Sequence, residues 1–426
     1  MLDRFIETMR GRISRPLQYY EDICVRCGAC VDACHFYAVS TDPAHIPASR
    51  MLLAKKVLQV ADARDGALLN WYRDIEENDE RMADRLQRAM WQCTGCRRCA
   101  VFCPLDLDTG LLVSAGRYSL LQEGLGPEMI GEIGDAELSK GEIINDIKDF
   151  YIDQMTEMET RLREEFSPDL RIPVDEKGAR VLYVPLVGEE AIVPAAKIFH
   201  AAGEDWTLSL FTATNHSYFT GDMVKTKEAA NWIVQEARRL GVQAIVYPEC
   251  GHATRTLLYY FDSWFEEEVS NVERVSIVKL LASYLQEGRI SVHPGTCEVP
   301  LTYHDPCNIG RNGGMYDEPR LLIRSVATDL RELSPSRELN WCCGGGGGLI
   351  AAMEEMDEIR LKAGRPKIEQ IRETGAEWVV TACENCKTQL ADLNNHYGLG
   401  IEIKGLVDLV ADALLIPSSA DVKEVQ

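Results

Sequence analysis

Short apolar runs alternate with amphipathic helical stretches through the second half of the chain. The runs occupy residues 180–184, 243–247, 301–303 and 377–381. Runs of this length that alternate with helices are typical of parallel strands in βαβ units. The pattern therefore predicts an α/β fold with parallel sheets beyond residue 180.

The first half of the chain has a helical pattern instead. Apolar residues recur at helical spacing in Ser49–Ala54 and in Met82–Leu86. An acidic and helix-prone stretch follows, most clearly over Ile143–Phe166. We expect an α-helical domain over residues 1–125 and an acidic helical connector over residues 126–172.

Two segments of the second half resemble each other. Gly241–Cys250 parallels Gly375–Cys383, and Glu204–Leu208 parallels Leu339–Cys343. In this register only the later segment has a pair of adjacent cysteines. The sequence therefore predicts two tandem βαβ units, of which the first is degenerate and the second intact. We place these units at residues 173–297 and 298–426.

The charge of the chain excludes some classes of partner. It contains 67 acidic and 45 basic residues, so its formal net charge is −22 at pH 7. This excess of negative charge argues against nucleic-acid binding. No apolar run reaches eighteen residues, and the first twenty residues lack the pattern of a signal peptide. We therefore expect a cytoplasmic protein without a membrane span.

The chain has 15 cysteines, and two runs of them have the spacing C-x2-C-x2-C-x3-C. In a long chain without secretory features, this spacing favours metal ligation over disulfides. It is the spacing of bacterial two-cluster ferredoxins, in which the fourth cysteine of each run serves the other cluster. The sequence thus predicts two cubane [4Fe-4S] clusters in a ferredoxin-like domain. Their expected ligand sets are Cys24, Cys27, Cys30 with Cys103, and Cys93, Cys96, Cys99 with Cys34.

A third group of cysteines has a different pattern. It consists of Cys307, the adjacent pair Cys342 and Cys343, and the C-x2-C pair Cys383 and Cys386. Five thiolates exceed the four that a cubane cluster needs. The side chains of adjacent cysteines also diverge, so an unusual cluster is expected.

Five consecutive glycines, residues 344–348, directly follow the paired cysteines. A backbone without side chains can approach cluster sulfides closely and donate N–H bonds to them. We therefore expect Gly344, Gly345 and Gly346 to contact the cofactor. The alternative is that the run is a flexible linker.

These motifs, in this order, resemble those of CCG-domain iron–sulfur proteins. The resemblance is to the catalytic iron–sulfur subunits of heterodisulfide reductases and to the related DsrK and TmcB subunits of sulfate-reducer membrane complexes. The matching segments are Tyr303–Cys307, Trp341–Gly344, Cys383–Cys386 and Glu249–Ala253. The resemblance implies a non-cubane [4Fe-4S] cluster that cleaves or forms a sulfur–sulfur bond. Only one CCG motif is intact here, which favours the DsrK and TmcB branch.

The resemblance also implies a cellular role. The chain would be the cytoplasmic catalytic subunit of a membrane-bound redox complex, held peripherally at the inner membrane by partner subunits. Electrons would move between the non-cubane cluster and a membrane b-type cytochrome or quinone-reactive subunit, with a periplasmic multihaem cytochrome c further along the complex. The substrate would be a disulfide or trisulfide on a small DsrC-like protein, whose arm would lie between residues 180–295 and 300–415.

His304, Cys250 and His252 are candidate catalytic residues. His304 could protonate the departing thiolate, because histidine titrates near neutral pH, or it could be a strand-end histidine satisfied by the backbone. Cys250 and His252 occupy the ligand position of the degenerate unit and could bound the substrate pocket. The alternative is a buried free cysteine beside a capping histidine. Cys297 fits no pattern.

Two other functions stay open. An electron-transfer subunit of a flavin dehydrogenase, of the glycolate oxidase or anaerobic glycerol-3-phosphate dehydrogenase type, would have the same modular order without a sulfur substrate. A scaffold or redox sensor would hold structural zinc at the C-x2-C sites. The identity of the redox partner distinguishes the flavin-dehydrogenase subunit from the heterodisulfide-reductase-like subunit. Metal analysis distinguishes the zinc-binding scaffold from both.

Overall fold

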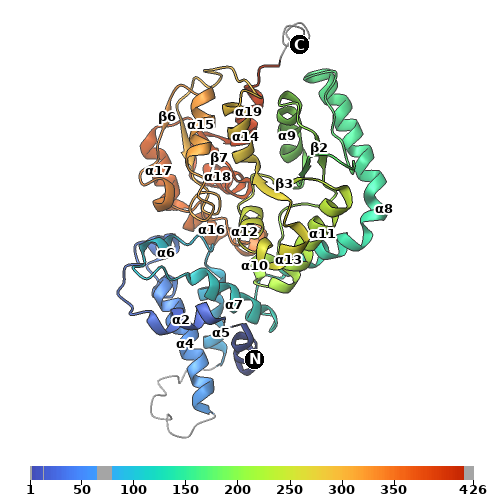
Figure 1. Cartoon of the computed structure of the whole chain (residues 1–426). Helices are drawn as coiled ribbons and strands as arrows, with labels where there is room; N and C mark the ends of the chain where they lie inside the picture. Colours follow the sequence, from blue (N-terminus) through green and yellow to red (C-terminus); the bar gives the residue numbers. More distant parts are fainter. Residues whose placement is uncertain (1, 13, 65–78, 417–426) are drawn as a thin grey trace. The chain divides into compact units, whose positions relative to one another are not determined.

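The computed structural model describes residues 2–12, 14–64 and 79–416 (Figure 1). The chain forms two compact units that are discontinuous in sequence, whereas the sequence predicted four consecutive domains. Residues 65–78 of the predicted first domain and 417–426 of the predicted fourth lie outside the described residues. Unit 1 consists of Met1–Asp135, His216–Met223 and Glu338–Glu369, and unit 2 consists of Ala136–Asn215, Val224–Arg337 and Gln370–Gln426.

Unit 1 is helical, as the apolar spacing predicts. Helix α7 packs against α1, α4 and α5, and its Leu112 and Leu120 are fully buried beside Met90 of α5. The helices of unit 1 are α1 (Leu2–Arg12), α2 (Arg15–Ile23), α3 (His35–Ser40), α4 (Pro47–Arg64), α5 (Asp79–Trp91), α6 (Arg98–Phe102), α7 (Thr109–Leu121), α10 (Ser217–Thr220) and α16 (Asp357–Ala363), with short 3-10 turns η1 (Pro43–His45) and η4 (Met353–Glu355).

Two later segments of the chain complete this helical core. Phe219 and Ala352 are buried in the same apolar cluster as Met90 and Leu112. The segment that contains Ala352 also contains the paired cysteines. Cys342 and Cys343 therefore belong to unit 1, and the other three cysteines of the third group belong to unit 2.

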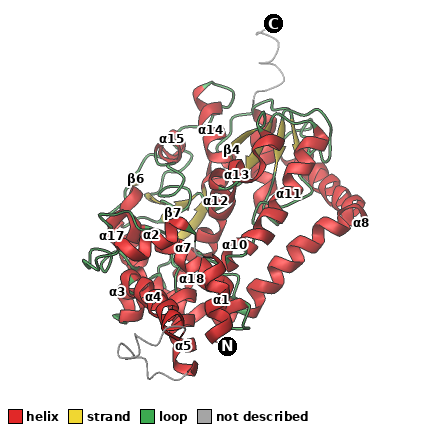
Figure 2. Ribbon diagram, turned by 60° about the horizontal axis from the view of Figure 1, so that its bottom comes forward, coloured by secondary structure: helices red, strands yellow, loops and turns green. Residues whose placement is uncertain are grey.

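Unit 2 contains two parallel four-stranded sheets, surrounded by helices in Figure 2. The first sheet has the order β2-β1-β3-β4, and the second has the order β6-β5-β7-β8. The strands are β1 (Val181–Tyr183), β2 (Trp206–Leu208), β3 (Ala244–Tyr247), β4 (Glu273–Ser276), β5 (Leu301–His304), β6 (Leu330–Arg331), β7 (Trp378–Thr381) and β8 (Glu402–Gly405). The helices are α9 (Glu189–Ala201), α12 (Gly251–Tyr259), α13 (Phe261–Val269), α14 (Ile277–Gln286), α15 (Asp317–Val326), α18 (Glu384–Tyr397) and α19 (Leu406–Asp412).

The predicted mixed α/β fold with parallel sheets is confirmed. The four apolar runs became β1, β3, β5 and β7, the inner strands of the two sheets. The edge strands β4, β6 and β8 gave no such pattern, because β4 and β8 begin with exposed residues and β6 has two residues. The remaining edge strand, β2, is a buried run of three residues that was not predicted as a strand.

The two sheets follow the same topology, and their helices pack in equivalent pairs. Helix α14, after the last strand of the first sheet, packs against α15, after the first strand of the second sheet. The reciprocal pair, α19 and α9, also packs together. This exchange of roles indicates two pseudo-symmetric copies. That the first copy is a degenerate CCG unit stays a prediction.

One predicted register was wrong. The sequence paired Glu204–Leu208 with Leu339–Cys343, but the strand equivalent to β2 is β6. Trp341 lies outside any strand, because the chain leaves the second sheet after β6 and joins unit 1. The segment that leaves the first sheet in the same way, after β2, is His216–Met223. It contains no cysteine.

The predicted acidic connector is a single long helix, α8 (Glu128–Glu165). Three other elements cross the boundary between the units: α11 (Met223–Leu240), η3 (Arg337–Leu339) and α17 (Arg365–Thr374). Among the described residues, no helix combines the length and apolar character that crossing a membrane requires.

Candidate iron–sulfur site

Short helices position the cysteines of the two ferredoxin runs in unit 1. Cys24 ends α2, and Cys34 lies directly before α3. In the second run, Cys99 lies within α6 and Cys103 ends it. Of these cysteines, Cys34 lies at a helix N-terminus, where free backbone N–H groups suit a negatively charged thiolate.

The electrostatic neighbours of the buried thiols follow the predicted crossed sets. Burial raises the pKa of Cys30, and the thiolates of Cys24 and Cys103 raise it further. Burial raises the pKa of Cys99 to about 12, with further contributions from Cys93 and Cys34. Each of these thiols thus interacts with cysteines of its own predicted set.

This chemistry fits iron–sulfur ligation. Clustered thiolates that repel one another in a buried site are costly unless a cation compensates their charge. A cavity bordered by Cys24, Cys27, Cys30 and Cys103 offers such a place. The residues present therefore fit a cluster at each ferredoxin set.

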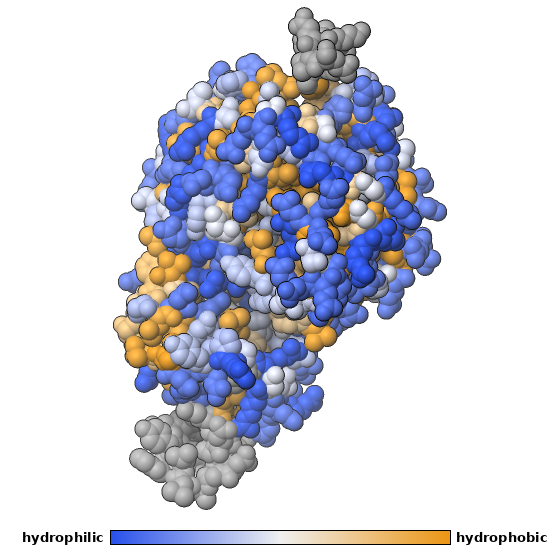
Figure 3. Space-filling model, viewed as in Figure 1, coloured by the Kyte–Doolittle hydropathy of each residue, from blue (hydrophilic) through white to orange (hydrophobic). Residues whose placement is uncertain are grey.

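The first of these sets lies at the surface. Cys27 is exposed. Apolar side chains close in sequence to the cysteines of this set are also exposed, namely Val25, Val101 and Leu105. Figure 3 shows apolar side chains gathered on the face of unit 1 that carries α6. Exposed apolar residues around a surface cluster are a suitable place for electrons to enter from a partner.

The paired cysteines lie in an ordered loop of unit 1. Cys342 and Cys343 are each 2% exposed. The backbone N–H of Gly344 donates a hydrogen bond to Cys342 Sγ, at 3.4 Å. Gly344 has φ +99°, and a Cβ there would lie 2.9 Å from the carbonyl oxygen of Arg360. This position therefore requires glycine, and the packing argues against a flexible linker.

The glycine run packs directly on the second ferredoxin motif. Gly347 has φ +65°, and a Cβ there would lie 3.0 Å from the carbonyl oxygen of Cys93. The buried guanidinium of Arg117 donates to both the Gly347 carbonyl, at 2.6 Å, and the Cys93 carbonyl, at 2.5 Å. Burial lowers the pKa of Arg117 to about 10. Arg117 thus ties the two motifs together.

A second arginine fixes the residues before the paired cysteines. Arg98 Nε donates to the carbonyl oxygen of Leu339, at 2.9 Å, and the guanidinium lies over the ring of Trp341, 3.6 Å from its centroid. The same side chain donates to the carbonyl oxygens of Asp32 and Ala33 in the first ferredoxin run. Trp341 therefore packs on an arginine and is only partly buried, whereas Trp206 is a core residue.

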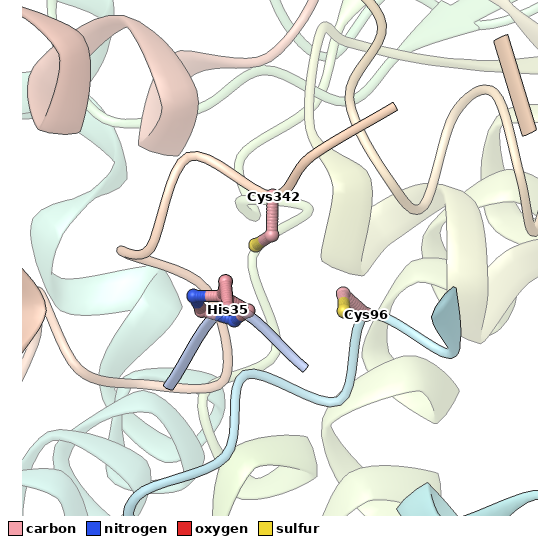
Figure 4. Close-up of side chains that lie close together, drawn as sticks. All are labelled: His35, Cys96 and Cys342. Carbon is pink, nitrogen blue, oxygen red and sulfur yellow. The ribbon is translucent and has the colours of Figure 1, made fainter. Parts of the chain in front are cut away.

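The result is a group of reactive side chains from three parts of unit 1. The ligand atoms of His35, Cys96 and Cys342 all lie within 4.8 Å of one another (Figure 4). Thr94 lies beside them, with its hydroxyl 3.4 Å from Cys342 Sγ and 3.2 Å from His35 Nε2. A predicted ligand of the second cubane cluster thus lies next to a predicted ligand of the third site.

The other cysteines of the third group lie in unit 2, where two adjacent parallel strands end. Cys307 follows β5, and Cys383 and Cys386 follow β7. A hydrogen bond from Cys386 lowers the pKa of Cys383 despite its burial. His304 is 1% exposed, and its ring nitrogen lies within 4.8 Å of Cys386 Sγ. Unit 2 therefore brings His304 close to the C-x2-C pair.

A buried ion pair supports this edge of the sheet. Asp305, next to His304, accepts two hydrogen bonds from Arg320, at 2.8 and 3.0 Å, and one from the backbone N–H of Arg337. Burial opposes the charge of Arg320, but hydrogen bonds to Asp305 and Glu332 raise its pKa overall. The pair fixes the backbone that leads to Cys307.

The first of the two copies contacts the C-x2-C pair of the second copy. Cys250 precedes α12 as Cys383 precedes α18, which agrees with the predicted equivalence. Burial raises the pKa of Cys250 to about 12, and Cys383 raises it further. His252 Nδ1 lies 3.4 Å from Asn385 Nδ2, and both Cys250 and His252 are 4% exposed. They lie beside the predicted ligands, but their role in a substrate pocket stays a prediction.

Sequence reasoning missed His35, Thr94, Arg98 and Arg117. The first three lie inside or directly beside the ferredoxin cysteine runs, so their positions were a usable indication. Arg117 lies in the middle of an apolar helix, where an arginine is unexpected unless its charge is satisfied. Cys297 is buried, and its thiol donates weakly to the carbonyl oxygen of Val299.

Comparison with known proteins supports both groups of cysteine motifs, the ferredoxin runs and the third group. Residues 21–107 match the 4Fe-4S dicluster domain, and residues 301–391 match the cysteine-rich domain CCG. The chain is 25% identical to the Hdr-like menaquinol oxidoreductase iron-sulfur subunit of Archaeoglobus profundus, over 100% of this chain and 84% of that protein. It is 24% identical to a component of the dihydromethanophenazine:CoB--CoM heterodisulfide reductase of Methanosarcina barkeri, over 93% of this chain and 95% of that protein.

A more distant relative is the EtfAB:quinone oxidoreductase of Syntrophomonas wolfei, at 23% identity over 87% of this chain and 55% of that protein. The predicted resemblance to CCG-domain proteins and to heterodisulfide reductases is confirmed. The chain thus combines a segment that matches the 4Fe-4S dicluster domain with one that matches the CCG domain, and its relatives include proteins named as parts of heterodisulfide reductases and of an Hdr-like oxidoreductase.

Proposed function

We propose that this chain is the iron–sulfur catalytic subunit of a membrane-associated redox complex and acts on a disulfide or trisulfide at a non-cubane [4Fe-4S] cluster. The observation that carries the proposal is the packing of the paired-cysteine loop on the second ferredoxin motif, with Cys342 beside Cys96. This arrangement suits electron delivery from ferredoxin clusters to a reactive third site.

The names of the relatives support both ends of this electron path. One relative is named as part of a menaquinol oxidoreductase and another as part of a heterodisulfide reductase. A quinone-reactive or b-type cytochrome subunit would therefore supply or receive electrons. The exposed first cysteine set, with Cys27 at the surface, is where we expect such a partner to exchange them. This partner would hold the chain at the cytoplasmic side of the membrane.

The third site would be held by the five cysteines of the third group, Cys307, Cys342, Cys343, Cys383 and Cys386. When bound, the cluster would supply an accessible iron that holds one sulfur of the substrate between single-electron steps. The backbone of Gly344 donates to a ligand sulfur, and we expect Gly345 and Gly346 to do the same toward the cluster.

His304 would hold the proton that the departing sulfur needs. Its buried ring lies next to Cys386, which supports a role as proton donor to a sulfur atom at this site. A small DsrC-like protein with a mobile cysteine-bearing arm would present the substrate. With one intact motif, the partner's own docking contacts would hold the sulfur in place.

The proposal is tested by anaerobic purification with the native membrane partners. Oxidised protein should show a paramagnetic signal that changes when a thiol substrate is added, and a quinol should reduce the clusters. A Cys343→Ala variant should lose the thiol-dependent signal and keep the ferredoxin signals. A wild-type signal that ignores every thiol or sulfur-carrier protein would contradict a sulfur substrate.

A second candidate function has its own support. The similarity to a protein named EtfAB:quinone oxidoreductase favours an electron-transfer role that accepts electrons from a flavoprotein. In that case a reduced electron-transferring flavoprotein would reduce the clusters rapidly, and disulfides would not reoxidise them. Stopped-flow absorbance with each donor and acceptor distinguishes the two functions.

A further inference from the structure

We infer that Thr94, positioned by His35, forms the contact through which electrons pass between the second ferredoxin set and Cys342, and that its hydroxyl sets the reduction potential of the third site. The inference rests on the proposed function, because it requires a cluster at Cys342. It concerns His35 and Thr94, which were not among the site residues predicted from the sequence.

The contact consists of three hydrogen-bonded side chains. Thr94 Oγ1 lies 3.4 Å from Cys342 Sγ and 3.2 Å from His35 Nε2. The other ring nitrogen of His35, Nδ1, donates to the carbonyl oxygen of Ala363, at 3.1 Å. Thr94 is 4% exposed, and His35 and Cys342 are 2% exposed. The three side chains are therefore shielded from solvent, and the His35 ring is held by hydrogen bonds at both of its nitrogens.

The surroundings hold this contact in place. Gly346 and Gly347 approach the backbone of Thr94 so closely that a Cβ on either would lie 3.0 to 3.5 Å from Thr94 atoms. Arg117 binds the carbonyl oxygens on both sides of this approach. The ring of His35 also packs on Phe36, with centroids 4.6 Å apart. Thr94 thus has little freedom to turn away from Cys342.

The direction of the hydrogen bond follows from the ligand chemistry. A cysteine that binds iron is a thiolate and can only accept hydrogen bonds. The Thr94 hydroxyl must then donate its single proton to Cys342 Sγ. Thr94 Oγ1 accepts from Nε2–H of His35, so in this arrangement His35 carries a proton on both ring nitrogens. Hydrogen bonds to ligand sulfurs stabilise the reduced, more negative cluster and raise its potential. Thr94 therefore makes the third site a better electron acceptor.

The electron step itself makes and breaks no bond. One electron leaves the second ferredoxin site, which is oxidised, and enters the third site, which is reduced. The membrane quinol replaces the electron. Because Cys96 and Cys342 sulfur atoms lie within 4.8 Å, this is a short path between two predicted ligand sets.

The test uses a pair of substitutions at Thr94 in the full-length, iron-loaded protein. Thr94→Val keeps the shape of the side chain and removes the hydroxyl, whereas Thr94→Ser keeps the hydroxyl. In a potentiometric titration followed by electron paramagnetic resonance, Thr94→Val should shift the third-site potential to a more negative value. We expect about a tenfold change in electron partition, equivalent to about 59 mV for one electron. Thr94→Ser should behave like the wild type.

A matched control is Thr109, whose hydroxyl interacts with another cysteine of the second ferredoxin set. The Thr109 hydroxyl interacts with Cys99, so Thr109→Val should shift the second ferredoxin potential and leave the third site unchanged. If Thr94→Val retains its iron and leaves the third-site potential unchanged, the inference is wrong. If Thr94→Val loses iron, the His35→Gln variant provides the test, because it releases the Thr94 side chain without changing it. The third-site potential of His35→Gln should then shift in the same direction. An unchanged potential in His35→Gln would overturn the inference. Wild-type protein without a third-site signal would overturn the proposed function as well.

Discussion

Cys342 is a buried thiol and Cys99 a partly buried one, both in unit 1, and their neighbours differ. Cys99 interacts with Cys93 and Cys34 of its own ferredoxin set, whereas Cys342 lies beside His35 and Cys96. The first environment is typical of an electron relay. The second suits a site that receives electrons, so substitution of the two thiols should have different consequences.

Cys342→Ala should abolish sulfur–sulfur turnover and leave the ferredoxin signals in place. Cys99→Ala should instead stop electron delivery from the membrane partner, because it removes a ligand of the relay. Turnover with an artificial donor and with the native partner, measured alongside paramagnetic resonance, separates the two outcomes. Full activity of Cys342→Ala with the natural substrate would contradict the site assignment.

Glu236 of α11 is a buried acid away from the cysteines. Its carboxylate accepts a hydrogen bond from the Leu210 N–H, at 2.9 Å, and one from the Ser209 hydroxyl. Burial nevertheless raises its pKa to about 7. The stability that its protonated form contributes should therefore be complete below about pH 4.5 and disappear as the pH rises through 7.

Glu236→Gln keeps the shape and removes the titration. The unfolding free energy of the wild type relative to Glu236→Gln should fall between about pH 4.5 and 7, by on the order of 3 kcal/mol at most. Chemical unfolding of both proteins across this range provides the measurement. Glu157→Gln, at an exposed position of α8, is the control and should show no such change. A constant difference between wild type and Glu236→Gln would show that the acid keeps its ordinary pKa in the fold.

Among the elements, the glycine run after the paired cysteines has a strict steric requirement. Gly347 combines a positive φ with contact to the Cys93 and Thr94 backbone. Gly398, which ends α18, has a similar φ of +61° but open space around it. Substitutions of these two glycines therefore distinguish two contributions to the free energy of unfolding, that of the left-handed backbone conformation and that of the close backbone approach.

Gly398→Ala should destabilise the protein by about 1 kcal/mol, since only the left-handed conformation is penalised. Gly347→Ala should cost more and should also alter the third-site signal, because the loop must move away from the second ferredoxin motif. Thermal unfolding and paramagnetic resonance of both variants check this. Equal destabilisation with unchanged spectra would mean that the loop adapts without disturbing the site.

The sequence predicted those elements whose pattern is local. The inner strands β1, β3, β5 and β7 are buried runs, and the cysteine spacing identified both ferredoxin motifs. The edge strands and the destination of the paired-cysteine loop could not be predicted, because they depend on packing between distant segments. Arg117 illustrates this limit, since its partners at Met90, Phe219 and Gly347 are separated by long stretches of chain.

At the scale of the whole molecule, the boundary between the two units divides the third cysteine group but not the ferredoxin sets. The third cysteine group takes two members from unit 1 and three from unit 2. The two ferredoxin sets, in contrast, lie entirely in unit 1. Loss of ligands in unit 2 should therefore affect only the third site, which metal analysis can measure.

Anaerobically prepared protein should contain about 12 irons, if each of three clusters holds four. Cys342→Ala and a Cys383→Ala, Cys386→Ala double variant should each retain about eight, because both would remove ligands of the proposed third cluster. Cys297→Ala, which replaces a buried thiol outside every motif, should retain about 12. A wild-type content near eight, or bound zinc, would exclude a third iron–sulfur cluster. Loss of iron in only one of the two unit variants would show that the five cysteines do not form one site.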